Sequence, residues 1–191
     1  MGTRHHLTVF LSWTAGVCLI VAYPPVRATA QSIEWSQPSA AGAPPAAAWP
    51  CRLVVADQLL PHVKIVWQRS ATFRQQCASI ARAGATVLLR TATSLQIRRP
   101  AQARIGVSAD GVTVARVLVQ LSADSIEHLG HELEHVLEYL EKMNLRKRLA
   151  DHRSGVTVSG VGYETGRAID AGTRVAREVR ESWRTCVDRS C

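Results

Sequence analysis

Two histidines and a glutamate within five consecutive residues are the clearest chemical signal in the chain. Residues 131–135 read HELEH, so His131 and His135 are four positions apart and Glu132 directly follows the first. On an α-helix, side chains four positions apart point the same way, and two imidazoles can share one metal ion. Glu132, offset by ~100° around the helix, can reach a water molecule on that ion. The pattern predicts zinc held by both histidines, with Glu132 as general base; the alternative is a solvated face of a helix rich in His and Glu.

A catalytic zinc ion needs a third protein ligand. The downstream candidates are Asp151, His152, Glu164 and Asp170. We favour Glu164, because it precedes a helical stripe of small residues that includes Ala168 and Gly172 and would let two helices pack closely. The alternative role of Glu164 is that of a first-turn glutamate favoured by the helix dipole.

The helix that carries the motif is predicted to run from Asp124, its cap, to about Leu145, with Glu127 completing a capping box. The motif histidines border its apolar face, where a cleft is expected. Glu134 and Glu138 are placed on the outer side and interpreted as solvated charges, although they could instead accept hydrogen bonds from ligand imidazoles. The candidates for stabilising an oxyanion are His128, His152, Tyr163 and Arg167.

The remaining pattern predicts the elements that position this helix. Residues 59–84 indicate two helices, the second capped by Ser70, although residues 63–67 also alternate like a strand. Strands are expected at residues 86–91, 104–108 and 112–121, and the last two flank an Asp110-Gly111 turn typical of a hairpin. We therefore expect an α+β domain, with a short mixed or antiparallel sheet packed against the motif helix and a C-terminal helix.

The N-terminal region is typical of an exported protein. Residues 1–30 predict a signal peptide cleaved after Ala30, because a basic start is followed by apolar residues 7–23 and by Ala28-Thr29-Ala30. The alternative, an uncleaved anchor, would be short for a membrane span. Residues 31–50, rich in Ala, Pro and Ser, predict a linker, which leaves residues 51–191 as the folded domain. We expect a periplasmic or extracellular protein without a stable membrane span after cleavage.

Cysteine content and charge agree with export. Four cysteines follow the predicted signal peptide, and an even number in an exported chain indicates two disulfides; three connectivities are open, and we favour Cys51 with Cys77 and Cys186 with Cys191. Loss of residues 1–30 leaves 21 Lys+Arg against 15 Asp+Glu, a net charge of +6. That charge favours anionic surroundings, but an exported protein is not expected to meet nucleic acid.

The sequence HELEH followed by Glu164 on a later helix resembles the gluzincin branch of zinc metallopeptidases, over about residues 112–178. The resemblance implies a small zincin-like domain, with zinc held by His131, His135 and Glu164 and with Glu132 as general base. It also implies hydrolysis of a peptide or protein substrate, which could be envelope-associated. An edge strand, assigned here to residues 112–121, would bind that substrate in extended form. The metzincin branch is excluded, because Glu138 and Glu141 stand where it has a glycine and a third histidine.

Two other functions remain open. The first is a non-catalytic envelope protein of zincin-like fold, in which any metal would be structural. The second is a binding module for an anionic polymer, which would act through the net charge of +6 and would be sensitive to salt but not to chelators.

Overall fold

The computed structural model describes residue 49, residues 51–160 and residues 162–188 of the 191-residue chain. The predicted signal peptide, nearly all of the predicted linker and the predicted pairing of Cys186 with Cys191 lie outside the residues so described. Among the helices of the described residues, none combines the length and the apolar character that crossing a bilayer requires.

A four-stranded mixed sheet with the strand order β1-β2-β4-β3 carries the domain. Its strands are β1 (Arg52–Val55), β2 (Thr86–Thr91), β3 (Ala101–Val107) and β4 (Thr113–Val119). The neighbours β1 and β2 are parallel, as are β2 and β4, whereas β3 runs antiparallel to β4. Buried residues alternate with partly buried ones along most of β2 and β4, and they include Leu89 and Val117, so one face of the sheet forms the floor of the core.

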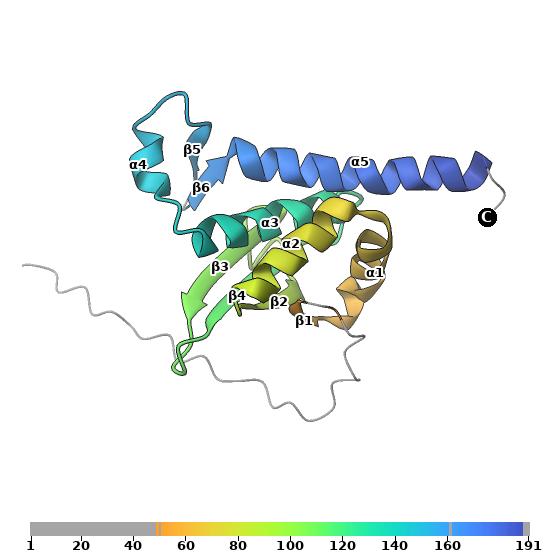
Figure 1. Cartoon of the computed structure of the whole chain (residues 1–191), viewed down its shortest axis with the longest axis horizontal. Coiled ribbons are helices and arrows are strands. Elements are labelled where there is room, and N and C mark those ends of the chain that lie inside the picture. Colours follow the sequence, from red (N-terminus) through yellow and green to blue (C-terminus); the bar gives the residue numbers. More distant parts are fainter. Residues whose placement is uncertain (1–48, 50, 161, 189–191) are drawn as a thin grey trace, which may run out of the picture. The chain divides into compact units, whose positions relative to one another are not determined.

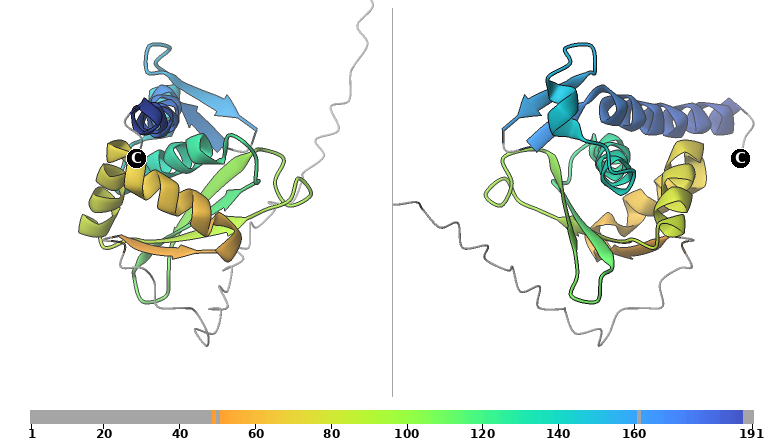
Figure 2. Two further views of the ribbon diagram at one scale, coloured as in Figure 1. Left: turned by 90° about the vertical axis from the view of Figure 1, so that its right-hand side faces the viewer. Right: turned by 60° about the vertical axis from the view of Figure 1, so that its left-hand side comes forward.

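The helices form two layers above this floor (Figure 1). A short 3-10 turn, η1 (Asp57–Leu59), leads into α1 (Leu60–Arg69), which is followed by α2 (Ala71–Arg82) and then α3 (Ser125–Leu140). The last helix, α5 (Gly166–Asp188), packs chiefly on α3 and lies across the helix layer on the side away from the sheet, as the rotated views also show (Figure 2). The helices predicted within residues 59–84, the strands and the hairpin are thus confirmed, as is the α+β class with a mixed sheet.

Polar contacts hold the second half of α5 against the first two helices. Ser70 caps α2 by accepting a hydrogen bond from the backbone N–H of Phe73, as predicted. Glu178 of α5 accepts hydrogen bonds from the hydroxyls of Ser70 and Thr72 and from the Thr72 backbone N–H. Burial favours the protonated form of Glu178, but these hydrogen bonds outweigh it and lower its pKa below the ordinary value. The carboxylate therefore joins α5 to the start of α2.

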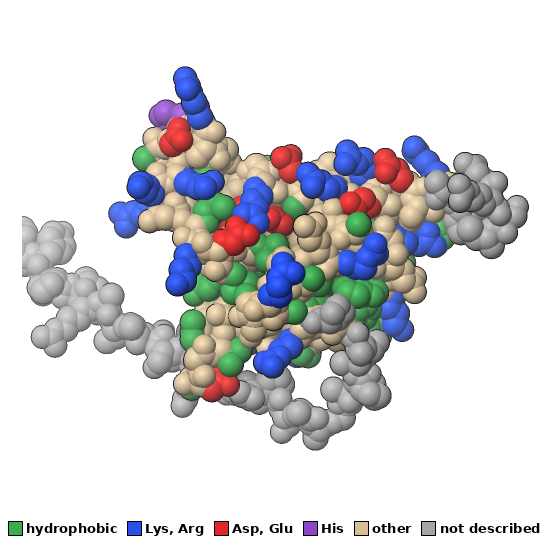
Figure 3. Space-filling view, viewed as in Figure 1, with side chains coloured by type: hydrophobic (Ala, Val, Ile, Leu, Met, Phe, Trp, Pro, Cys, Tyr) green, Lys and Arg blue, Asp and Glu red, His purple; other side chains and the backbone are tan. Residues whose placement is uncertain are grey.

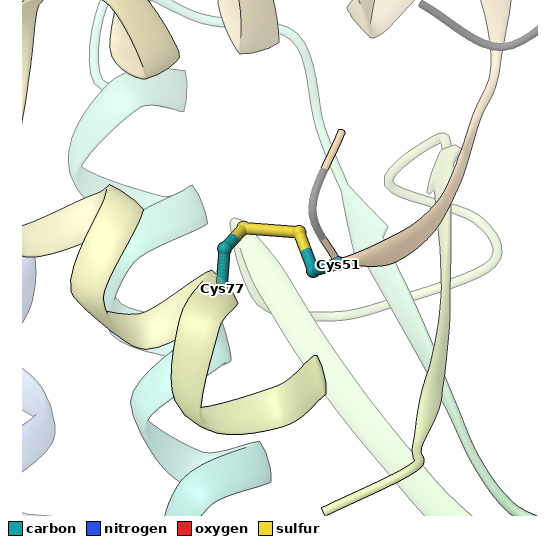
Figure 4. Close-up of a disulfide and its surroundings, with 2 residues drawn as sticks. All are labelled: Cys51 and Cys77. Atoms are coloured by element: carbon teal, nitrogen blue, oxygen red, sulfur yellow. A yellow bond between two sulfur atoms is a disulfide. The ribbon is translucent and has the colours of Figure 1, made fainter. Parts of the chain in front are cut away.

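A disulfide between Cys51 and Cys77 joins the start of β1 to α2 (Figure 4). The two residues are 26 positions apart, their Cα atoms lie 5.1 Å from each other, and both are buried. This pair is one of the two pairings that the cysteine spacing favours. It closes the loop that contains α1 and pins the first strand of the sheet to the helix layer.

A small subdomain connects α3 to α5. It contains α4 (Leu145–Leu149) and a two-stranded antiparallel sheet of β5 (Val156–Ser159) and β6 (Gly162–Thr165). The structure departs from prediction here, because α3 ends at Leu140 and not near Leu145. Lys142 adopts a positive φ of 55°, which turns the chain out of the helix, and the basic residues 146–148 lie in α4 instead. The predicted cap is also wrong in detail, since the Asp124 side chain makes no capping hydrogen bond.

The sheet order corrects a further prediction. Residues 112–121 were expected to supply an open edge strand, but β4 lies between β2 and β3. Strand β3 is the outer strand beside it, because β2 pairs in parallel with β4 and occupies its other side. The open edge near α3 therefore belongs to residues 101–107.

Basic side chains are spread over the surface. Figure 3 shows Lys and Arg side chains scattered across the visible face, with acidic side chains between them along α5. This face does not present the single concentrated basic patch that a binding module for an anionic polymer would be expected to use.

Candidate metal centre

His131 and His135 project from α3 toward a carboxylate of the β5–β6 hairpin. The Oε1 atom of Glu164 lies 3.3 Å from Nε2 of His131 and 3.6 Å from Nε2 of His135. The two imidazole rings are 4.9 Å apart between centroids and nearly perpendicular, at 80°. One potential ligand atom from each of the three residues lies within 4.8 Å of the others, so this group could hold a metal ion. The three residues selected from the sequence as ligands are brought together.

The position of Glu164 differs from its prediction in one respect. It was expected in the first turn of a helix, on the stripe of Ala168 and Gly172, but it lies on β6, two residues before α5 begins. Pairing of Glu164 with Thr157 of β5 fixes its backbone. The carboxylate therefore reaches the histidines from a strand. The small residues of α5 affect its position only indirectly, by setting how the helix after β6 packs on α3.

Two glycines allow α3 and α5 to approach closely. A Cβ atom on Gly130 of α3 would lie 2.7 Å from Cγ2 of Val175, and a Cβ atom on Gly172 of α5 would lie 2.8 Å from the carbonyl oxygen of Glu127. Such separations are shorter than real side chains show, so neither position has room for a methyl group. The predicted close packing at Gly172 is thus present, and it occurs next to His131, whose Cβ would be 3.0 Å away.

A buried carboxylate orients His135. Its Nδ1 atom lies 2.8 Å from Oε2 of Glu138, and the Glu138 side chain is only 1 % exposed. The other carboxylate oxygen of Glu138 accepts a hydrogen bond of 2.6 Å from the hydroxyl of Thr165, the residue after Glu164. That hydroxyl also accepts the backbone N–H of Ala168 in the first turn of α5. Glu138 was interpreted as a solvated charge, and this is wrong: it holds Nδ1 and leaves Nε2 facing Glu164.

Glu134 is also buried, because α5 covers the side of α3 that was expected to face solvent. It accepts hydrogen bonds from Gln76 of α2, at 2.7 Å, and from Arg167 of α5. Arg167 also forms an ion pair with Glu141. The hydrogen bonds to Glu141 are the largest contribution to the raised pKa of the Arg167 guanidinium. Arg167 is therefore committed to the packing of α5 on α3 and is not free to stabilise an oxyanion in the cleft.

Glu132 points away from this packing and toward β3. Its side chain is almost fully buried, and burial raises its pKa to about 7. The positive charge of His135 and a hydrogen bond with the backbone of Ala103 oppose that rise, whereas the charge of Glu164 adds to it. A carboxyl group with a pKa near neutrality can both take and return a proton at physiological pH, which suits the predicted general base.

The two histidines are electrostatically unlike. Burial is the largest influence on His131 and lowers its pKa, despite the opposing charge of Glu164. Burial also disfavours the charged form of His135, but the hydrogen bond to Glu138 and the charges of Glu132 and Glu164 together raise its pKa. His135, which is hydrogen-bonded to Glu138, is thus the more basic of the two histidines.

A cleft of about 530 Å³ lies between α3, β3 and the β5–β6 hairpin, and it is lined by His131, Glu132, His135 and Glu164. Of the other candidates, His128 and Tyr163 line the cleft, whereas Asp151, His152 and Asp170 are exposed and do not. Among the parts of the lining that the sequence did not indicate are Arg99, Tyr139 and the outer strand β3. An arginine before a strand has no distinguishing pattern, but the helical spacing of Tyr139, four positions after His135, could have placed it on the same side.

The donor set fits a metal ion that accepts nitrogen and oxygen ligands. Two imidazole nitrogens and one carboxylate oxygen are donors that zinc and similar ions accept, and all three residues line the cleft. The fixed Nδ1 of His135 supports this, since ligand imidazoles commonly donate their other N–H to a carboxylate. Comparison of the chain with protein-family models, curated protein sequences and solved structures gave no match.

Proposed function

We propose that the protein is a zinc-dependent hydrolase of peptide or amide bonds with a zincin-like arrangement. The observation that carries the proposal is the convergence of His131, His135 and Glu164 beside a buried glutamate with a pKa near 7. Three N/O ligands that line a cleft agree with zinc in hydrolytic sites. Zinc bound there would supply a Lewis acid that polarises a carbonyl group and lowers the pKa of water.

Glu132 is the proposed general base. It lines the same cleft as the three proposed ligands, and a hydrogen bond with the backbone of Ala103 joins it to β3. It would accept a proton from the attacking water and pass it to the leaving amine. His128 and Tyr163 line the cleft and are the remaining candidates to donate a hydrogen bond to the developing oxyanion.

The outer strand β3 is the proposed substrate-binding edge. Four of its residues line the cleft, namely Ala101, Gln102, Ala103 and Ile105. Its partner β4 occupies only one side, so the other side offers backbone N–H and C=O groups to an extended peptide. A peptide bound there would cross the cleft in front of the three ligands.

Export is part of the proposal. The disulfide between Cys51 and Cys77 agrees with an oxidising compartment, where such bonds form and persist. Together with the signal peptide predicted for residues 1–30, it supports a periplasmic or extracellular enzyme that acts on peptides or proteins there.

The test is the variant Glu132→Gln in the zinc-loaded protein, compared with Glu127→Gln, which changes another glutamate of the same cleft. A mixture of random-sequence peptides serves as substrate, and mass spectrometry records the products. We expect Glu132→Gln to keep its zinc and to lose at least ~100-fold in hydrolysis, whereas Glu127→Gln stays active. Full activity of Glu132→Gln contradicts the assignment of the base, and no cleavage by the wild type favours a non-catalytic envelope protein.

A further inference from the structure

Arg99 occupies one end of the cleft. It lies two residues before β3 and lines the cleft together with Glu132, His131 and Glu164. It is the only arginine or lysine among the described residues of the lining, whose other ionisable groups are histidines, tyrosines and glutamates. Arg99 thus brings a permanent positive charge to a lining that also contains three glutamates.

The guanidinium of Arg99 belongs to a partly buried residue and has an unused donor. Its Nη2 atom is buried and has no hydrogen-bond partner among the described residues. It lies against the turn of the β5–β6 hairpin, since a Cβ atom on Gly160 would be 3.0 Å from it. A buried N–H group without a partner is costly in free energy. Because the guanidinium also lines the cleft, it suits a ligand that accepts hydrogen bonds, and a carboxylate is the best match in charge and shape.

The direction of β3 indicates which part of a substrate would meet Arg99. A peptide that pairs antiparallel with the outer edge of β3 has its C-terminal end beside the N-terminal end of that strand. Arg99 stands at that end, and the β5–β6 hairpin is in contact with it there. A peptide that extends past the metal ligands in this direction soon reaches the guanidinium.

We infer that Arg99 is a specificity-determining residue, which binds a carboxylate of the peptide on the C-terminal side of the bond to be cleaved. This inference rests on the proposed function, because it assumes a peptide on β3. The carboxylate has two chemical sources, a free C-terminus or an acidic side chain, and both place the same group in the same position. The consequence is selectivity for peptides that carry that negative charge.

A binding experiment tests the inference without requiring turnover. Zinc-loaded Glu132→Gln protein is immobilised and offered acetylated random hexapeptides as an equimolar mixture of free acids and C-terminal amides. The retained peptides are identified by mass spectrometry. The same is done with Arg99→Gln and, as a matched control, with Arg98→Gln, each added to Glu132→Gln; Arg98 is exposed and does not line the cleft. Thermal unfolding confirms that each variant is folded.

We expect peptides with a carboxylate to be retained ~10- to 100-fold over those without, a ratio that Arg98→Gln keeps and Arg99→Gln reduces to near one. Enrichment of free acids identifies the C-terminus as the source, and enrichment of amides that contain Asp or Glu identifies a side chain. The inference is overturned if Arg99→Gln retains peptides in the same ratio as the protein that keeps Arg99. It is also overturned if the protein that keeps Arg99 shows no preference for peptides with a carboxylate.

Cleavage by the otherwise wild-type protein separates this inference from the proposed function. Arg99-dependent retention without any cleavage leaves carboxylate binding in place and rejects the hydrolase. Cleavage that depends on Glu132 but shows the same selectivity in Arg99→Gln leaves the hydrolase in place and rejects the role of Arg99. If Arg99→Gln loses the same fraction of its cleavage rate for peptides with and without a carboxylate, the role of Arg99 is also rejected, because the guanidinium would then stabilise the oxyanion.

Discussion

Gly172 of α5 and His131 of α3 are in direct contact where the two helices cross. A methyl group at Gly172 would be 3.0 Å from the Cβ atom of His131 and 2.8 Å from the carbonyl oxygen of Glu127. Because Glu164 lies two residues before α5, the depth at which α5 packs also sets how far the carboxylate reaches toward the histidines. The helix crossing and the metal centre are therefore parts of one arrangement.

Substitution of Gly172 by alanine should disturb both. The backbone of α3 cannot yield easily, so we expect Gly172→Ala to destabilise the protein by about 1–3 kcal/mol and to weaken metal binding. Denaturant unfolding and competition with a chelator measure the two effects. Arg174→Ala, on the exposed side of α5, is the control and should change neither. A Gly172→Ala variant with the stability and the metal affinity of the wild type would show that the two helices do not pack tightly at this crossing.

Glu138 should control the metal affinity through His135. The variant Glu138→Gln keeps the size of the side chain but removes the charge that holds Nδ1 of His135 and accepts the Thr165 hydroxyl. We expect the affinity for zinc to fall ~10- to 100-fold. The matched control is Glu141→Gln, whose carboxylate is bound to Arg167 at the surface and does not line the cleft. Equal affinities of the two variants would show that Glu138 only packs.

The contribution of Glu132 to the stability of the metal-free protein should fall as the pH rises past the ordinary pKa of a glutamate. Burial raises the pKa of Glu132 from 4.5 to about 7, so the folded state binds this proton more tightly than the unfolded chain does. The stabilisation is complete below pH ~4.5 and is lost between pH ~4.5 and ~7. Glu132→Gln removes the ionisation, and we expect it to be more stable than the wild type at pH 8, by up to about 3 kcal/mol.

Unfolding of the metal-free proteins by denaturant at pH 4 and pH 8 measures this effect. The advantage of Glu132→Gln should disappear at pH 4, where the wild-type carboxyl group is neutral in both states. Glu127→Gln, a partly buried residue of the same helix, serves as the control. An advantage that is the same at both pH values would contradict a raised pKa at Glu132.

The proposed metal ligands could be selected from the sequence because their relationship is mostly local. The spacing of His131 and His135 requires only a helix, and the stripe around Gly172 indicated close packing of a second helix. The element that holds Glu164 could not be read from the sequence. Strands β5 and β6 pair only with each other, and such short strands carry a weak pattern.

Burial of acidic residues on α3 was beyond sequence reasoning for another reason. An amphipathic helix with one apolar face is expected to expose the opposite side, and Glu134 and Glu138 fall on that side. Here α5 covers it, and Gln76, Arg167, His135 and Thr165 satisfy the carboxylates. Likewise, the outer position of β3 follows from the parallel pairing of β2 with β4, a long-range contact that no local pattern encodes.

Removal of the disulfide should weaken the whole domain. The double variant Cys51→Ser/Cys77→Ser frees a loop of 26 residues, and we expect a loss of about 3 kcal/mol in the free energy of unfolding. Denaturant unfolding under oxidising conditions measures the loss. The wild type in the presence of a reductant should unfold like the variant. A variant as stable as the oxidised wild type would show that this bond does not constrain the chain.

The central claim is that His131, His135 and Glu164 hold a single zinc ion. Metal analysis by mass spectrometry of the purified protein, after equilibration with zinc and removal of the excess, tests it most directly. We expect one zinc per chain in the wild type and in His152→Ala, an exposed histidine outside the cleft, and none in His131→Ala/His135→Ala. Glu164→Gln should bind zinc at least ~10-fold more weakly. A wild type without zinc, or a double variant that retains it, would contradict the account.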